Sequence, residues 1–118
     1  MLNSPVLSVS VVIPARNERH TIERILNDLE SQTFSDAFEV VIADGASTDG
    51  TYEYLQAVSN ARTYRFSLVL VENTRGTIPA GLNAAVQAAE GEYIIRVDCH
   101  ASISTDYIES IVTAGRKS

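Results

Sequence analysis

One carboxylate and one imidazole in this sequence are spaced so that they could share a metal ion. Asp98 and His100 are separated by a single residue. In extended backbone alternate side chains point the same way, so both groups could face one divalent cation. Two ligands are fewer than a dedicated metal site needs. An isolated pair of this kind more often ends a strand and makes ordinary loop hydrogen bonds, and both interpretations stay open on spacing alone.

The segment from residue 43 to residue 51 resembles a phosphate-binding loop but lacks its essential residue. Two glycines have the Gly-x-x-x-x-Gly spacing, whereas Thr51 stands where the lysine of such a loop belongs. A dinucleotide fold would place its glycines after the first strand, where residues 14–18 contain none. Asp44 still stands out, because a carboxylate that ends a buried strand is not explained by helix capping, the role expected of Asp49.

Three arginines are candidates for binding an anion. Most arginines only solvate a surface, and that interpretation holds for each of Arg16, Arg75 and Arg96 taken alone. Arg75 is the strongest candidate because it precedes a predicted helix, and a helix N-terminus attracts anions. By contrast, Cys99 is expected to fill space, and His20 is expected to lie on the surface.

Four short apolar runs predict the strands that position these residues. Each run is rich in β-branched residues and is followed by a stretch with helical spacing. Strands that alternate with helices form a mostly parallel sheet, so we predict an α/β, Rossmann-like fold. Ligands of such sheets bind at the carboxyl ends of the strands, where the residues above are found. The predicted strands are residues 9–13, 38–43, 66–71 and 93–97.

The helices between the predicted strands are identified by the spacing of their apolar residues. In the third helix, Thr77 is expected to be the N-cap and Gly91 the glycine of the C-cap. The first helix is expected to bury Ile22, Ile25, Leu26 and Leu29. The third is expected to bury Ile78, Leu82, Ala85, Val86 and Ala89.

The composition is that of an ordinary globular chain, and it excludes several classes of function. The 118 residues suffice for one domain or part of one. Nine Lys and Arg against fifteen Asp and Glu give a net charge of −6, which disfavours binding to nucleic acid. Cys99 is the single cysteine, which excludes an intrachain disulfide and a cysteine-based zinc site. No apolar run approaches the roughly 20 residues of a membrane span, so we expect a soluble chain.

Taken together, four segments resemble glycosyltransferase family 2, enzymes that use nucleotide sugars and have a GT-A fold. The segments are residues 10–18, 42–51, 83–94 and 96–101. The match in order and spacing covers nearly the whole chain, from Ser8 to about Ile111. The Arg-Val-Asp-Cys-His-Ala sequence of the last segment is similar to the branch that includes succinoglycan-type exopolysaccharide transferases.

The resemblance implies a role for each matching residue. Asp44 would lie near the base of the nucleotide, and Asp98 next to the ribose and the metal. His100 would take the second position of the family's Asp-x-Asp, which binds the divalent cation bridging the diphosphate. An imidazole there favours Mn²⁺ over Mg²⁺, and Arg75 is the candidate contact to the diphosphate. The nucleotide pocket would be lined by Pro14, Ala15, Arg16, Asn17 and Glu18.

Two positions depart from the pattern of the family. Many relatives have a second acid where this chain has Gly45, which removes one group that could recognise the base. An aromatic residue often stacks on the base where this chain has Arg16, and a guanidinium stacks with less specificity.

The resemblance further implies that residues 1–118 are the nucleotide-sugar-binding half of a longer domain. In this family the acceptor-binding half follows, and Asp106 and Glu109 fall on a predicted surface helix, so the catalytic base is expected beyond Ser118. The implied reaction is inverting transfer from a UDP-sugar to an acceptor glycan or lipid-linked sugar, in polysaccharide biosynthesis. The implied location is the cytoplasm at the inner face of the membrane, with membrane contact only through further C-terminal segments. An uncovered sheet edge would favour self-association.

Two alternatives share this architecture. A noncatalytic, receiver-like module would also have a carboxylate at Asp44, but it needs an acidic cluster after the first strand and a lysine after a fifth. Asn17 and Glu18 are a poor cluster, and the only lysine is Lys117. A sugar nucleotidyltransferase needs a glycine-rich loop with Arg and Lys after the first strand, which is absent. We therefore expect a glycosyltransferase, with no transfer by residues 1–118 alone.

Overall fold

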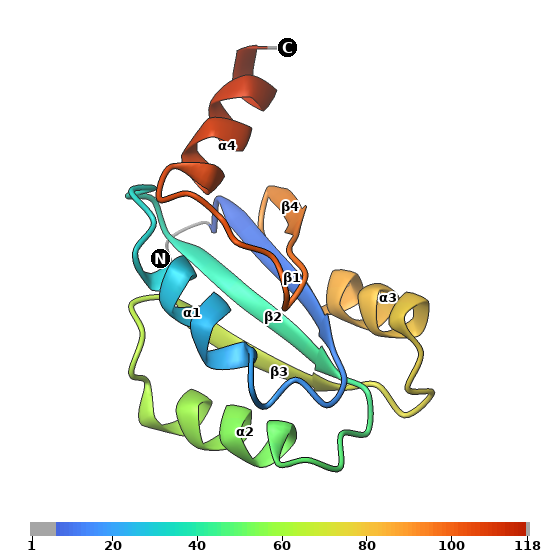
Figure 1. Cartoon of the computed structure of the whole chain (residues 1–118). Helices are drawn as coiled ribbons and strands as arrows, with labels where there is room; N and C mark the ends of the chain where they lie inside the picture. The colour runs from blue at the N-terminus through green and yellow to red at the C-terminus, as the bar shows by residue number, and fades with distance from the viewer. Residues whose placement is uncertain (1–6, 118) are drawn as a thin grey trace, which may run out of the picture.

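Four parallel strands form one sheet in the computed structural model, which describes residues 7–117. The strand order is β3-β2-β1-β4. Helices α1 and α2 lie on one face of the sheet and α3 on the other (Figure 1). The predicted α/β fold is confirmed. In chain order the elements are β1 (Val9–Ala15), α1 (Ile22–Glu30), β2 (Phe38–Asp44), α2 (Thr51–Ala61), β3 (Ser67–Glu72), α3 (Ile78–Ala88), β4 (Tyr93–Arg96) and α4 (Tyr107–Lys117).

The two central strands are buried along their whole length. Strands β1 and β2 have neighbours on both sides and helices over their faces, which explains why most of their residues are apolar. Their register places Ala15 opposite Asp44, so both strands end at the same level. The edge strands are more exposed, and their bounds differ slightly from those predicted: β3 extends to Glu72, and β4 ends at Arg96.

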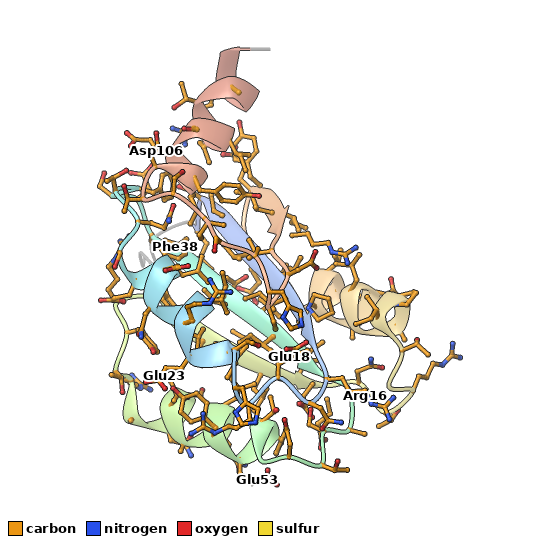
Figure 2. All side chains as sticks on the ribbon, in the orientation of Figure 1. Arg16, Glu18, Glu23, Phe38, Glu53 and Asp106 are labelled. Atoms are coloured by element: carbon orange, nitrogen blue, oxygen red, sulfur yellow. The ribbon has the colours of Figure 1, made fainter. Side chains whose placement is uncertain are left out.

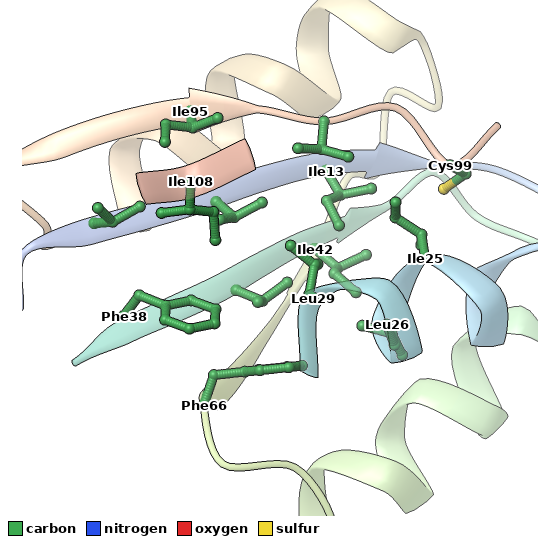
Figure 3. Packing of buried hydrophobic residues seen from close by; sticks show 14 of the residues in the cluster. Ile13, Ile25, Leu26, Leu29, Phe38, Ile42, Phe66, Ile95, Cys99 and Ile108 are labelled. Carbon is green, nitrogen blue, oxygen red and sulfur yellow. The ribbon is translucent and has the colours of Figure 1, made fainter. Parts of the chain in front are cut away.

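Most of the hydrophobic core lies between the sheet and α1. Figure 3 shows Ile13 and Ile42 of the sheet packed with Leu26 and Leu29 of α1. All four predicted core residues of α1 are fully buried, so that prediction is confirmed. A smaller cluster lies under α3, where Ala85 contacts the other face of the sheet.

The predicted buried face of α3 is wrong for Ile78 and Val86, whereas Ala85 is buried and Leu82 and Ala89 pack against the core. Ile78 is 47% exposed and Val86 is 39% exposed, whereas Gly81 and Ala85 are buried. The helix approaches the sheet closely, because a Cβ on Gly81 would lie 3.3 Å from Cβ of Pro14. Gly81 and Ala85 therefore face the sheet with Leu82 packed beside them, and the side chains of Ile78 and Val86 point away from it.

Gly91 is not the helix-ending glycine that its position suggested. The last turn of α3 ends through the N–H of Ala89, which donates to the carbonyl of Val86, and Gly91 lacks a positive φ. A Cβ on Gly91 would lie 2.6 Å from backbone N of Ser10. Glycine is required here by close packing, and its N–H donates to Oγ of Ser10 at 2.7 Å. That hydroxyl in turn donates to the buried carboxylate of Glu39 at 2.6 Å.

The segment after β4 leads back to the opposite end of the sheet, where α4 begins. The N–H of Ile108 donates to Oε1 of Gln32, and the N–H of Thr33 donates to the carbonyl of Thr105. These bonds fix the start of α4 beside the α1–β2 connection. Within the described residues, no helix is long and apolar enough to cross a membrane.

Candidate functional site

The segments that follow the strands meet at one edge of the sheet. The arrowheads of β1, β2 and β3 point to this edge in Figure 1, and Figure 2 shows Arg16 and Glu18 beside it. Three loops build the edge together with the segment after β4. The loops are residues 16–21, 45–50 and 73–77, and the segment is residues 97–106.

The first two loops are joined by hydrogen bonds between side chains and backbone. The N–H of Asn17 donates to Oγ of Ser47 at 2.9 Å, and the N–H of Thr48 donates to Oδ1 of Asn17 at 2.8 Å. Asn17 has a φ of 54°, a left-handed conformation that asparagine adopts more readily than most residues. Each loop therefore fixes the shape of the other.

The carboxylate of Asp49 performs the capping role predicted for it, from one residue before the N-cap of α2. Oδ1 accepts the N–H of Thr51 at 3.1 Å and also the Thr51 hydroxyl. Oδ2 accepts the N–H of Arg19 at 3.1 Å. The Thr51 hydroxyl stabilises the charged carboxylate, and this lowers the pKa of Asp49.

Asp44 ends β2 beside a small cavity. Only 4% of the residue is exposed, and its carboxylate accepts two hydrogen bonds from Ser47, from Oγ at 2.6 Å and from N–H at 3.1 Å. The carboxylate therefore shapes the second loop in addition to facing the site. The cavity has a volume of about 220 Å³ and is lined by Asp44, Ala46, Ser47, Tyr52, Glu53, Glu72, Asn73 and Thr74.

Arg16 connects the first loop to the third. Its Nη1 donates to the carbonyl of Gly76 at 3.2 Å. Gly76 has a φ of 76°, a left-handed conformation that favours glycine. Arg75, the predicted diphosphate contact, is exposed immediately before Gly76. The structure thus places the two arginines on one side of the site.

Asn73 is a structural organiser of the third loop that the sequence did not single out. Its Nδ2 donates to the carbonyl of Thr77 at 2.8 Å, and its Oδ1 accepts the N–H of Gly76 at 3.3 Å. Its own N–H donates to the carbonyl of Asp44 at 2.8 Å. A short amide at a strand end, three residues before a glycine, is the signal that could have identified it.

Asp98 and His100 lie in a turn, and the extended backbone assumed for them is wrong. The N–H of Ala101 donates to the carbonyl of Asp98 at 3.0 Å, which closes the turn. The carboxylate of Asp98 is paired with Arg96 at 3.1 Å, and the side chain is 62% exposed. Nε2 of His100 lies 3.0 Å from Oε2 of Glu18. Of the three candidate arginines, Arg96 is thus the ion-pair partner of Asp98.

Cys99 packs beneath this turn, as expected of a space-filling residue. It is 3% exposed, and its Sγ lies 3.9 Å from the carbonyl oxygen of Pro14. Burial raises the pKa of the Cys99 thiol to about 12, with smaller contributions from the negative charges of Glu18 and Asp98. The thiol therefore stays protonated at neutral pH and anchors the turn against β1.

The comparisons with known proteins identify the family of this chain. Residues 10–117 match the family model of glycosyl transferase family 2, which is nearly the whole chain. The chain belongs to glycosyltransferase family 2. The resemblance of the four sequence segments is thereby confirmed.

Named relatives of family 2 include a succinoglycan biosynthesis protein and a poly(ribitol-phosphate) β-N-acetylglucosaminyltransferase. The chain is 35% identical over 104 residues to the succinoglycan biosynthesis protein ExoA of Rhizobium meliloti, which covers 86% of this chain and 31% of ExoA. It is similar to the crystal structure of Staphylococcus aureus TarS in complex with UDP-GlcNAc, with a TM-score of 0.77 and 29% identity over 94% of this chain. The chain spans about a third of the length of these relatives.

A second similar structure is a mannosyltransferase from Pyrobaculum calidifontis in complex with GDP-Man and Mn²⁺. It has a TM-score of 0.77 and 31% identity, and the match covers 97% of this chain and 32% of that one. These structural matches confirm the GT-A fold expected from the sequence. They also show that relatives of this family bind nucleotide sugars with different bases.

The potential metal ligands of this family 2 chain suit a cation that is bound partly by the protein and partly by the substrate. Among residues 7–117, no three His, Cys, Asp or Glu side chains gather to bind a metal by themselves. Asp98 and His100 are both exposed at the carboxyl edge, with 62% and 72% of their side chains accessible. Cations of nucleotide-dependent enzymes are commonly bound by one or two protein groups together with phosphate oxygens and water. The two residues suit that mode.

Proposed function

We propose that this chain is the donor-binding half of an inverting glycosyltransferase that uses a nucleoside-diphosphate sugar. The observation that carries the proposal is the meeting of three family segments, residues 10–18, 42–51 and 96–101, at one sheet edge, in a fold whose relatives bind such donors. We favour a uridine nucleotide, because TarS, whose structures hold UDP and UDP-GlcNAc, is also a relative by sequence, 34% identical over 104 residues.

In this proposal, each strand end contributes a different contact to the donor. Asp44 faces the base from beside the 220 Å³ cavity. Residues 14–18 line the nucleotide pocket, with Pro14 and Ala15 at the buried end of β1 and residues 16–18 in the loop after it. Asp98 lies next to the ribose. The exposed guanidinium of Arg75 and the unused donors of Arg16 meet the diphosphate, because guanidinium groups match phosphate oxygens in geometry and charge.

Asp98 and His100 are the residues that would hold a divalent cation, Mn²⁺ or Mg²⁺. Such a cation supplies Lewis-acid stabilisation of the charge that develops on a nucleoside diphosphate leaving group. The protein groups orient the nucleotide and separate its phosphates from the negative charges of the edge.

We propose that the catalytic base and the acceptor site lie outside residues 1–118. A base must come within about 3 Å of the acceptor hydroxyl, or one water away. Asp106 lies at the opposite end of the sheet from Glu18 (Figure 2), and Glu109 lies one turn further along α4. Neither can reach a donor bound at the carboxyl edge. We further propose that the acceptor is a glycan or a lipid-linked sugar at the cytoplasmic face of the membrane.

Calorimetry with UDP and GDP, each with and without Mn²⁺, tests this function. We expect UDP to bind the chain in the presence of Mn²⁺. Asp98→Asn should lose most of that affinity, while the matched variant Asp106→Asn, at the other end of the sheet, should keep it. A folded chain that binds neither nucleotide with Mn²⁺ would contradict the proposal.

A further inference from the structure

One contact at the candidate site joins two loops that are distant in the sequence. Nε2 of His100, in the turn after β4, lies 3.0 Å from Oε2 of Glu18, in the loop after β1. The imidazole is 72% exposed, whereas the carboxylate is 18% exposed. An exposed ring is thus held at one nitrogen by a more buried anion. Without this contact, a side chain so accessible would sample several rotamers.

The carboxylate that holds the ring is itself fixed in place. Its other oxygen, Oε1, accepts the hydroxyl of Thr21 at 2.7 Å. The backbone N–H of Glu18 donates to Oγ1 of Thr51 at 3.0 Å, and its carbonyl accepts the N–H of Ile22 at 2.8 Å, at the start of α1. Each carboxylate oxygen has a partner, so the carboxylate of Glu18 is fixed in a direction that lets it orient His100.

The contact determines which nitrogen of His100 remains available. A neutral imidazole carries one proton, and the nitrogen that donates to a carboxylate is the protonated one. Nδ1 has no hydrogen-bond partner among the described residues. Histidines that bind metals commonly donate their other N–H to a carboxylate, which fixes the tautomer and the direction of the ring.

We propose that Glu18 is a positioning residue that holds His100 as the Nε2–H tautomer and directs Nδ1 toward the cation. This inference rests on the proposed function, because it assigns a purpose to the cation-binding role of His100. It also reassigns Glu18, which was expected to line the nucleotide pocket. The loop after β1 then contributes to the cation site through His100, with Thr21 completing a Thr21–Glu18–His100 chain.

Nuclear magnetic resonance of the imidazole tests the pairing without any ligand. At a pH where His100 is neutral, the wild-type chain should show a hydrogen-bonded Nε2–H signal with slowed solvent exchange. Glu18→Ala should abolish that signal, and Glu18→Gln should retain it, because the amide oxygen still accepts. Glu23→Ala, which removes an exposed carboxylate of α1, is the matched control. A signal that survives Glu18→Ala would overturn the inference.

Electron paramagnetic resonance measures Mn²⁺ binding with and without UDP. This measurement tests the purpose of the Glu18–His100 contact. Loss of the orienting carboxylate should weaken Mn²⁺ binding in the presence of UDP by about 10- to 100-fold. The same Glu18→Ala change in a His100→Ala chain should have no further effect, since Glu18 acts through His100. Equal weakening in both backgrounds would overturn the inference. A wild-type chain that binds no UDP at all would instead overturn the proposed function.

Discussion

Replacing Gly91 with alanine should destabilise the fold strongly, although the change adds one methyl group. The new Cβ would lie 2.6 Å from Ser10 N and from Val9 C, both backbone atoms of the central strand β1. The turn before β4 must move, and the 2.7 Å bond from Gly91 N–H to Ser10 Oγ must lengthen. Overpacking costs about 1–3 kcal/mol, and a buried hydrogen bond that is lost costs about 1–3 kcal/mol more. We expect a total loss of about 4 kcal/mol.

Urea unfolding followed by circular dichroism measures this loss. With a typical slope of about 2 kcal/mol per molar urea, the midpoint should fall by about 2 M. Gly50→Ala is the matched control, because Gly50 has a φ of 94° but its Cβ would meet nothing within 4 Å. That control should lose only about 1–2 kcal/mol, the cost of a left-handed alanine. If both variants lose the same stability, the packing argument is wrong.

Three further predictions concern other parts of the chain. Cys99, 3% exposed, should resist iodoacetamide at pH 8 until the chain unfolds; mass spectrometry at increasing urea would show this. Burial raises the pKa of Tyr64 to about 12, so the folded chain keeps a proton that the unfolded chain loses, and stability should fall from pH 10 to 12. Absorbance at 295 nm should show a late ionisation that Tyr64→Phe removes. Asn73→Ala should cost about 1–3 kcal/mol in urea, since Thr77 O and Gly76 N–H lose a partner.

The sequence predicts the fold well where packing is made by large apolar residues. The four apolar residues of α1 signal its buried face because each contributes a large side chain to the core. The same reasoning succeeds for Ala85 of α3 but fails for Ile78 and Val86, since the closest approach to the sheet is made at Gly81 and Ala85. Hydropathy gives small residues little weight, so a close helix–sheet approach leaves almost no trace in the periodicity. The prediction that Gly91 ends α3 is wrong for a related reason. Its close contact is with the backbone of β1, a strand far away in the sequence, and local sequence does not reveal such a contact.

The candidate site is predictable in its location and less so in its contacts. Parallel strands end at one edge, so the residues after each strand had to meet there. The common direction expected of Asp98 and His100 required extended backbone, and a turn closed by the carbonyl of Asp98 replaces it. The contact between His100 and Glu18 depends on how two loops face each other, which residue spacing along the chain does not encode.

The mutual bonds of the loops have a consequence for redesigning these enzymes. The shape of the first loop depends on Ser47, that of the second on Asn17, and that of the third on the carbonyl of Asp44. Transplanting a single loop from a relative would leave its former partners without their hydrogen bonds. A chimera intended to accept another donor should therefore exchange the three loops as one cassette, and single-loop grafts should express poorly.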